Sequence, residues 1–161
     1  MSLESAILDH DPDILSGSRY AFVTAAYNLS LVDRLYEAAH QRLLQQNIPS
    51  EQIKRFQVPG SFEVPYLINL LALSSDYDCL LALGIVIAGD TRHHEVIEET
   101  TAQSFQEISI RTRIPVINGI ITATTRLQAE QRAGAEINRG VEFAETAMTM
   151  AQHKRQLSDL I

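Results

Sequence analysis

The chain has 161 residues, of which 45% are hydrophobic and 20% are charged, as is usual for one globular domain with its own core. Its formal net charge of −7, without any basic stripe, argues against nonspecific nucleic-acid binding, although one arginine can still bind the phosphate of a small ligand. No apolar segment approaches the length of about 18 residues that suggests a membrane span, and the N-terminal sequence lacks the basic and apolar regions of a secretory signal. We therefore expect a cytoplasmic protein that neither enters a membrane nor binds nucleic acid.

The N-terminal residues 1–18 combine acidic side chains with Pro12, Gly17 and isolated apolar positions. We expect a weakly ordered tail, of the kind that can become ordered against a partner subunit. The remainder, residues 19–161, contains no internal repeat, linker or low-complexity segment, and we expect it to form a single domain.

Four apolar or β-branched runs predict strands, at residues 19–25, 53–58, 79–87 and 115–121. The third run is uninterrupted by charge, which suits a strand buried on both faces of a parallel sheet. It begins with the single cysteine of the chain, Cys79, which we expect to be a buried core residue and not part of a disulfide.

Helices are predicted between the strands and after the last one: from Ser30 to about Asn47, from Phe62 or Glu63 to Ser74, from about His93 to Arg111, from Thr125 to near Gly134, and from about Arg139 onward. Ser30 with Asp33 and Thr125 with Gln128 have the spacing of capping pairs. The third helix has few apolar positions, and we expect it to pack poorly as a core helix and to line a subunit contact or a water-filled opening instead. The alternation of strands and helices predicts an α/β fold, a three-layer αβα sandwich whose four-stranded parallel sheet has helices on both faces.

Ligands of such sheets bind beyond the carboxyl ends of the strands, so the loops after the strands form the candidate site. Tyr27 and Asn28 follow the first strand; the Tyr27 ring could stack on a flat heterocycle, or it could pack half-buried at the helix start. After the second strand, Gly60 permits close approach of a ligand to the backbone, and amides near Ser61 can donate to ligand oxygens. Glu63 is open to two interpretations, ligand binding or a favourable interaction with the helix dipole.

After the third strand, Gly89, Asp90 and Thr91 precede the next helix. Their amides and the Thr91 hydroxyl could hold a phosphate at a helix N-terminus. We expect the Asp90 carboxylate, which would repel a phosphate, to turn away and cap the helix. Most Gly-Asp-Thr segments at such positions are only caps, so the segment alone does not establish a phosphate site.

Two adjacent histidines follow, and because successive helical residues point about 100° apart, only one of them can face a site. A metal site from His94 and Glu98 lacks a third ligand and the HExxH pattern, so no metal is expected. The alternative is a proton-transfer histidine at the strand end, where the positive end of the helix disfavours the charged imidazole. A third possibility is that the histidine is exposed and has no chemical role.

Within the fourth strand, Asn118 and Gly119 are expected to lie at or near the binding edge. Arg132, on the short helix that follows, has a planar fork of donors that suits phosphate, or it could be a solvated cation at a helix C-terminus. The chain has no compelling Ser-His-Asp or Cys-His pattern and no GxGxxG or GxxxxGK[ST] loop. The residues alone therefore predict a small-molecule site that could include a phosphate.

Five motifs occur in one order: Tyr27-Asn28, PGSFEVP at 59–65, LGIVIAGDTRHH at 83–94, NGIITATTRLQAEQRAG at 118–134, and Asn138-Arg139-Gly140. Together they resemble the lumazine synthase family over roughly residues 19–155. The resemblance implies a flavodoxin-like fold and a transferase without cofactor or metal. Its reaction would condense 5-amino-6-(D-ribitylamino)uracil with 3,4-dihydroxy-2-butanone 4-phosphate to 6,7-dimethyl-8-ribityllumazine, releasing phosphate and water, in riboflavin biosynthesis.

The resemblance also implies an assembly. Members of the family form homopentamers, some of which pair as decamers or close into icosahedral shells, with active sites between neighbouring subunits. On this basis the partners of the chain would be its small-molecule substrates and further copies of itself.

The resemblance assigns roles to individual residues. His93 matches the proton-transfer histidine, and Tyr27 matches the aromatic residue that stacks on the pyrimidine. We expect Asn28, beside Tyr27, to bind substrate as well. The ribityl chain would bind the segment after Gly60, and the pyrimidine would lie beside the end of the third strand; the matching residues are Ser61, Phe62 and Glu63, then Ile85, Val86 and Ile87.

The phosphate would bind the segment Gly89-Asp90-Thr91 together with Arg132. Asn118 matches a position that completes the pocket from the adjacent subunit. Three departures from the family pattern stand out: Ala88 replaces a common arginine, Asn118 replaces a bulky or aromatic residue, and residues 134–140 form a shorter and less basic loop. The alternative function is a non-catalytic lumazine- or flavin-binding or shell-forming protein of the same fold. A flavodoxin-like flavin carrier is disfavoured because TAAYNLS, at 24–30, lacks a phosphate cradle rich in Ser, Thr and Gly.

Overall fold

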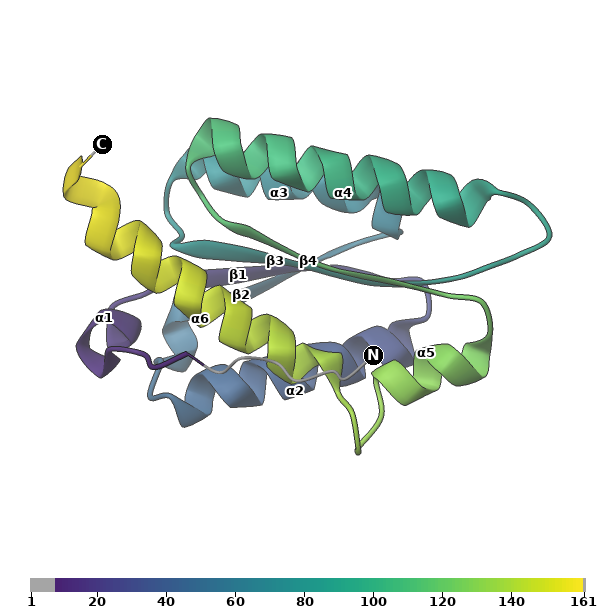
Figure 1. The fold of residues 1–161 in the computed structure, drawn as a ribbon, viewed down its shortest axis with the longest axis horizontal. Coiled ribbons are helices and arrows are strands. Elements are labelled where there is room, and N and C mark those ends of the chain that lie inside the picture. The colour runs from purple at the N-terminus through teal and green to yellow at the C-terminus, as the bar shows by residue number, and fades with distance from the viewer. Residues whose placement is uncertain (1–7, 161) are drawn as a thin grey trace.

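The structure, a computed structural model, describes residues 8–160. Within these residues a four-stranded parallel sheet lies at the centre, with the strand order β2-β1-β3-β4 (Figure 1). The strands are β1 (Tyr20–Ala25), β2 (Ile53–Val58), β3 (Cys79–Ile87) and β4 (Val116–Ala123). Because the strands are parallel, their carboxyl ends all point to the same edge of the sheet.

Helices cover both faces of the sheet (Figure 1). One face packs against α3 (Val64–Ser74) and α4 (His93–Thr112). The other packs against α1 (Pro12–Ser16), α2 (Leu29–Gln45), α5 (Arg126–Arg132) and α6 (Arg139–Leu157). Short 3₁₀ helices lie at Ser50–Gln52, Ser61–Glu63 and Ser158–Leu160. The prediction of a three-layer αβα sandwich is confirmed.

The strand β3 joins the two apolar cores, because its successive side chains point to opposite faces. Leu81 and Leu83 pack into the core beside α2 and α6, whereas Leu80 and Ala82 pack beside α3 and α4. Burial on both faces explains why this run carries no charge. Cys79 is buried as predicted, and its burial raises the pKa of the thiol.

Two of the four strands have the predicted limits, and the other two shift. β1 begins one residue later than expected, and β4 runs from Val116 to Ala123 instead of ending at residue 121. Within residues 8–160, no helix has both the length and the apolar character needed to cross a membrane.

One of the predicted capping pairs is confirmed and the other is wrong. The Thr125 hydroxyl accepts from the Gln128 amide at 3.2 Å, at the start of α5. α2 instead begins at Leu29 after Asn28, so Ser30 lies inside its first turn and does not cap it. Asp33 pairs with the Arg55 guanidinium on β2.

The helix α4 packs better than its few apolar residues suggest. Ile97, Phe105 and Ile108 are buried on one narrow face, and Thr101 is buried between them. The Thr101 hydroxyl donates to the Ile97 carbonyl at 2.7 Å, so its burial leaves no unpaired donor. The expectation of poor packing is therefore wrong.

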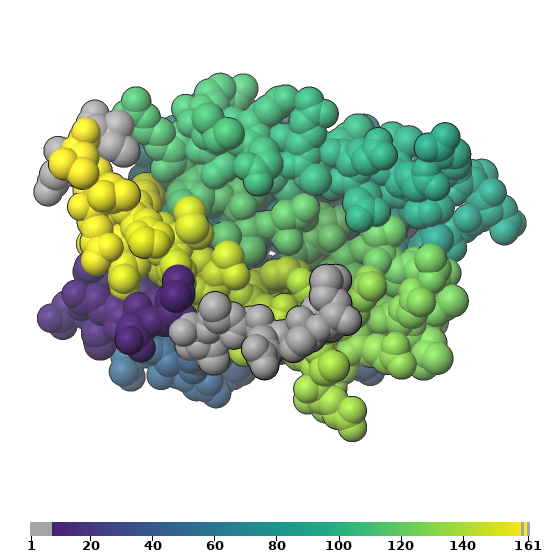
Figure 2. All heavy atoms as spheres, viewed as in Figure 1, coloured from purple at the N-terminus to yellow at the C-terminus, as the bar shows by residue number. Residues whose placement is uncertain are grey.

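Of residues 1–18, for which a weakly ordered tail is predicted, residues 1–7 lie outside the described residues and Pro12–Ser16 form α1. Asp11 caps α1 by accepting from the Asp13 amide at 2.9 Å, and Leu15 is buried in the core. The Asp11 amide donates to Gln152 of α6 at 2.7 Å, so this segment contacts the C-terminal helix of its own chain. Figure 2 shows the purple α1 segment lying against the yellow C-terminal helix.

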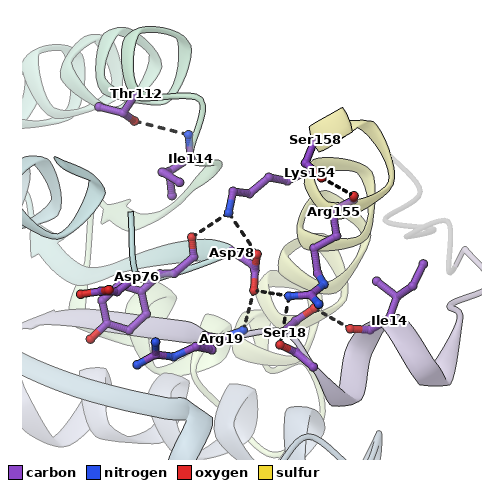
Figure 3. Close-up of polar contacts among 12 residues, drawn as sticks. Ile14, Ser18, Arg19, Asp76, Asp78, Thr112, Ile114, Lys154, Arg155 and Ser158 are labelled. Atoms are coloured by element: carbon purple, nitrogen blue, oxygen red, sulfur yellow. Dashed lines mark hydrogen bonds and ion pairs between the residues drawn. The ribbon is translucent and has the colours of Figure 1, made fainter. Parts of the chain in front are cut away.

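A buried carboxylate, that of Asp78, ties the C-terminal helix to the amino end of β3 (Figure 3). Asp78 precedes β3 and accepts from the Arg19 amide at 2.9 Å. Its two oxygens also pair with Lys154 at 3.0 Å and Arg155 at 3.2 Å. Arg155 donates further to the Gly17 carbonyl at 3.1 Å, which links α6 to the segment after α1.

Candidate active site

A cavity of about 540 Å³ opens at the carboxyl ends of β1, β2 and β3. Ten of its lining residues are among those that the sequence singled out, and one more was missed. The lining consists of Tyr27, Asn28, Gly60, Ser61, Phe62, Glu63, Ile85, Val86, Ile87, His93 and Ile97. The structure therefore brings three strand-following loops and the start of α4 together around one space.

Tyr27 does not pack within this chain, because 75% of the residue is exposed. It lines the cavity from the loop after β1. Its neighbour Asn28 has a left-handed backbone, with φ 53° and ψ 39°, and donates from Nδ2 to the Ile85 carbonyl at 2.9 Å. An exposed aromatic face at the edge of a cavity is available to stack on a flat ligand.

The segment after β2 approaches the cavity as a 3₁₀ helix at Ser61–Glu63. A Cβ atom at Gly60 would lie 2.9 Å from Glu63 Oε2 and 3.9 Å from Tyr27 Cδ2. The Glu63 carboxylate therefore folds back over Gly60 and lies near the Tyr27 ring. Glu63 precedes α3 and makes no side-chain cap bond, so its carboxylate is free to accept hydrogen bonds from a ligand.

The two adjacent histidines point to different places. His93 is the first residue of α4 and lines the cavity, with Ile97 one turn further along the same helix face. His94 does not line the cavity, and its Nδ1 lies 3.0 Å from the Thr91 carbonyl oxygen. Within residues 8–160, no cluster of three or more His, Cys, Asp or Glu side chains is placed to hold a metal.

Ile97 is the lining residue that sequence reasoning missed. The available signal was its position four residues after His93, which places both side chains on one face of a helix. Since Ile97 also fits a core position, its apolar character alone could not distinguish the two roles.

The segment Gly89-Asp90-Thr91 lies outside the cavity lining and is exposed. The residue that precedes α4 is Arg92, whose guanidinium pairs with Glu95 at 2.7 Å. The prediction that Asp90 caps this helix is therefore wrong, because the helix begins three residues later. Gly89 has no neighbouring atom within 4 Å of where a Cβ would lie, so this loop is open to solvent or to another molecule.

Asn118 and Arg132 also lie outside the cavity of the single chain. Asn118 pairs in register with Ala82 and is exposed on the edge strand β4. Because β4 continues to Ala123, Asn118 lies well before the carboxyl end, and the expectation that it lies at the binding edge of its own sheet is wrong. Arg132 is the last residue of α5, the helix that follows β4 in the chain, and its guanidinium donates to the Thr122 carbonyl.

The cavity combines four chemical features. It offers an exposed aromatic ring, a carboxylate, an imidazole and the apolar end of β3, formed by Ile85, Val86 and Ile87. A flat heterocycle can lie between the ring and the strand end, with its polar substituents toward Glu63. The imidazole can then transfer protons at the ligand.

Comparison with known proteins shows the family of the chain. The family model of 6,7-dimethyl-8-ribityllumazine synthase matches residues 17–155. A 6,7-dimethyl-8-ribityllumazine synthase of Pyrococcus furiosus is 36% identical over 143 residues, which cover 89% of this chain and 89% of the relative. An enzyme of the same name from Xylella fastidiosa strain M12 is 33% identical, over 84% of this chain and 88% of the relative. One from Gloeobacter violaceus is 35% identical, over 89% of this chain and 82% of the relative. The chain therefore belongs to the 6,7-dimethyl-8-ribityllumazine synthase family.

Proposed function

We propose that this chain catalyses the condensation of 5-amino-6-(D-ribitylamino)uracil with 3,4-dihydroxy-2-butanone 4-phosphate. The product is 6,7-dimethyl-8-ribityllumazine, formed in riboflavin biosynthesis with release of phosphate and water. The observation that carries the proposal is the single cavity lined by Tyr27, Glu63 and His93, in a chain of this family. Both substrates are small and polar, and we place the reaction in the cytoplasm.

The reaction needs orientation and proton transfer. One substrate amine must attack the ketone, water must leave the adduct, and phosphate must be eliminated. The second amine must then attack the remaining carbonyl and lose a second water, which closes the ring. Holding two reactants in the correct geometry supplies much of the acceleration. A positioned acid or base adds about 100- to 10,000-fold, and His93 is the group in the cavity lining suited to that role.

Each end of the cavity suits a different part of the substrates. The pyrimidine stacks on Tyr27 beside Val86 and Ile87, and the ribityl hydroxyls bind the segment of Ser61 and Glu63. The Glu63 carboxylate is a strong acceptor for these hydroxyls, because a charged partner makes the shorter and stronger hydrogen bonds. The condensation needs no external oxidant or reductant, and its steps are proton transfers, additions and eliminations, so the proposal includes neither a redox cofactor nor a metal.

Binding of the phosphate is proposed to involve two copies of the chain. Gly89, Asp90 and Thr91 are exposed in the loop between Ile87 and His93, which both line the cavity. Arg132 and Asn118 lie outside the lining of their own cavity. We propose that Arg132 binds the phosphate together with the 89–91 segment, and that Asn118 completes the cavity of an adjacent subunit.

Membership of the family implies an oligomer, and we propose a homopentamer, with decamers or icosahedral shells as larger forms. An apolar stripe supports association: four large side chains, spaced by three or four residues from the 3₁₀ helix into α3, are exposed in the single chain. They are Phe62, Tyr66, Leu70 and Leu73, with 59, 72, 45 and 61% of each residue exposed. Sedimentation velocity would distinguish a pentamer from a larger shell, and a monomer at assay concentrations would contradict this part of the proposal.

A direct assay tests the function. The purified protein is mixed with both substrates, and the absorbance and fluorescence of the lumazine product are followed. The reaction also proceeds slowly without protein, and this rate is the uncatalysed background. We expect the protein to form product well above it. A protein that binds the product but forms none above that background would instead be the non-catalytic binding protein, and one purified with tightly held FMN would be a flavin carrier.

A further inference from the structure

The loop after β1 makes a sharp turn at one residue. β1 ends at Ala25, the Ala26 amide donates to the Val58 carbonyl at 2.8 Å, and α2 begins at Leu29. Between them, Asn28 takes the left-handed conformation, which asparagine tolerates better than other residues with a Cβ atom. This one turn both places Tyr27 at the cavity and precedes the start of α2.

The side chain of Asn28 is free for a contact elsewhere, because it makes no capping bond to α2. Its Nδ2 donates to the Ile85 carbonyl at 2.9 Å. The ladder between β1 and β3 ends at the pair Thr24 and Leu83, two residues before Ile85. The Asn28 amide therefore continues the contact between the loop and β3 beyond the last paired residues of the strands.

The ring of Tyr27 depends on this arrangement. With 75% of Tyr27 exposed, packing within the chain does little to hold the ring. The direction of the ring instead depends on the backbone of Asn28. That backbone is fixed by its left-handed conformation and by the hydrogen bond from the Asn28 side chain to the Ile85 carbonyl. Ile85, unlike Tyr27, is buried in the core and provides a rigid anchor.

We propose that Asn28 is a positioning residue, whose left-handed backbone and side-chain amide together hold Tyr27 at the cavity against the end of β3. This inference rests on the proposed function, because the stacked ligand is the pyrimidine of that reaction. It changes the role that the sequence suggested for Asn28, from a residue that binds substrate to one that acts through Tyr27.

Variants separate the two features of Asn28. Asn28→Gly keeps a residue that tolerates the left-handed backbone but removes the amide. Asn28→Asp also tolerates that backbone, but it places a carboxylate against the Ile85 carbonyl. Asn47 supplies the matched control, because it is also left-handed, with φ 60°, and lies at the other end of α2.

The first readout needs no ligand. Hydrogen exchange followed by mass spectrometry reports how firmly residues 26–29 are held. We expect exchange in this segment to become about tenfold faster in Asn28→Gly and to stay unchanged in Asn47→Gly. Equal exchange in Asn28→Gly and the parent would overturn the inference, whether or not the protein catalyses the proposed reaction.

The second readout is the use of the pyrimidine. We expect Asn28→Gly to raise the KM for 5-amino-6-(D-ribitylamino)uracil and the Kd of the lumazine product about tenfold, with kcat within about threefold of the parent. Asn28→Asp should raise both constants further, and Asn47→Gly should change neither. An Asn28→Asp variant with the parent's KM and Kd would contradict the role of the amide.

A double-mutant cycle distinguishes positioning from direct contact. If Asn28 acts through Tyr27, Asn28→Gly has little further effect on product Kd in a Tyr27→Ala background. Additive effects of the two substitutions would mean that Asn28 binds the ligand itself and would overturn the inference. Failure of the parent to form product would instead contradict the proposed function, while hydrogen exchange would still decide the role of Asn28.

Discussion

The Ser61 hydroxyl occupies the space that a Cβ atom at Gly84 would need. Ser61 is buried and begins the 3₁₀ helix that lines the cavity, while Gly84 lies within β3. A Cβ atom at Gly84 would also come within 3.0 Å of Ile120 Cδ1. The absence of a side chain at Gly84 therefore allows the loop after β2 to close onto the sheet and form one side of the site.

We expect Gly84→Ala to destabilise the fold by about 1–3 kcal/mol, because the added methyl group overpacks a filled space. The KM for the pyrimidine substrate should rise as well, since Ser61 and its neighbours are displaced. Urea unfolding gives the free energy of unfolding. Gly89→Ala is the control, because its Cβ would meet nothing within 4 Å and its φ is not positive; equal stability of the two variants would contradict the proposed contact.

His93→Ala should lower kcat about 100- to 10,000-fold without abolishing turnover, because orientation of the two substrates is retained. His94→Ala is the matched control; it loses only the contact with the Thr91 carbonyl and should keep kcat within about threefold of the parent. Steady-state assays of lumazine formation provide the measurement. Unchanged turnover in His93→Ala would count strongly against His93 as the proton carrier.

Arg132→Ala should raise the KM for the phosphorylated substrate about 10- to 100-fold, which is the usual cost of a lost hydrogen bond to a charged group. The KM for the pyrimidine substrate should change little. Arg126→Ala provides the comparison on the same helix, since Arg126 is exposed and pairs only with Glu130 at 3.0 Å. If both variants keep the parent's kinetics with the phosphate substrate, the phosphate role of Arg132 is wrong.

Alkaline pH should weaken the fold through Cys79. Burial raises the pKa of its thiol above the unfolded value of about 8.5, so the unfolded chain loses its proton first as the pH rises. The contribution of Cys79 to the free energy of unfolding is therefore retained below pH 8.5 and lost above it. Between pH 8 and pH 10 this contribution falls by about 2 kcal/mol. Urea unfolding of Cys79→Ala should show a decline smaller by that amount, and an equal decline in parent and variant would contradict the prediction.

Asp78→Ala should destabilise the fold by about 2–4 kcal/mol, because it leaves Lys154 and the Arg19 amide without their buried acceptor (Figure 3). Glu95→Ala removes an exposed pair with Arg92 and should cost at most about 0.5 kcal/mol. Thermal unfolding of both variants provides the comparison. Since Asp78 lies at the edge opposite the cavity, the KM values of Asp78→Ala should equal those of the parent below its Tm.

The strands and the chain order of the loops were predictable from the sequence because their signals are local. The charge-free run of β3 predicted burial on both faces, and the runs at residues 53–58 and 79–87 gave strand limits that agree with the structure. The ordered motifs predicted the family, which the comparisons confirmed. For the site, the parallel order of strands was enough to predict that loops far apart in the chain would meet at one edge.

Local sequence patterns gave wrong predictions where the role of a residue depends on contacts with distant parts of the chain. Ser30 had the spacing of a capping residue, but the left-handed backbone of Asn28 starts α2 one residue before it. Asp90 had the residue type of a cap, but α4 begins after Arg92. Residues 8–18 lack a strong helix pattern, yet Pro12–Ser16 form α1, because Leu15 enters the core and Asp11 bonds to α6.

The sequence by itself therefore determined the class of fold, the family and the set of loops that carry the site, because hydrophobic periodicity and residue order are properties of neighbouring residues. Only the tertiary structure decided that Ile97 lines the cavity beside His93, that Tyr27 is exposed, and that the Asn28 amide is bonded to Ile85. These outcomes depend on the turn at each helix start and on contacts between segments tens of residues apart. Such contacts form only when the sheet and its helices pack.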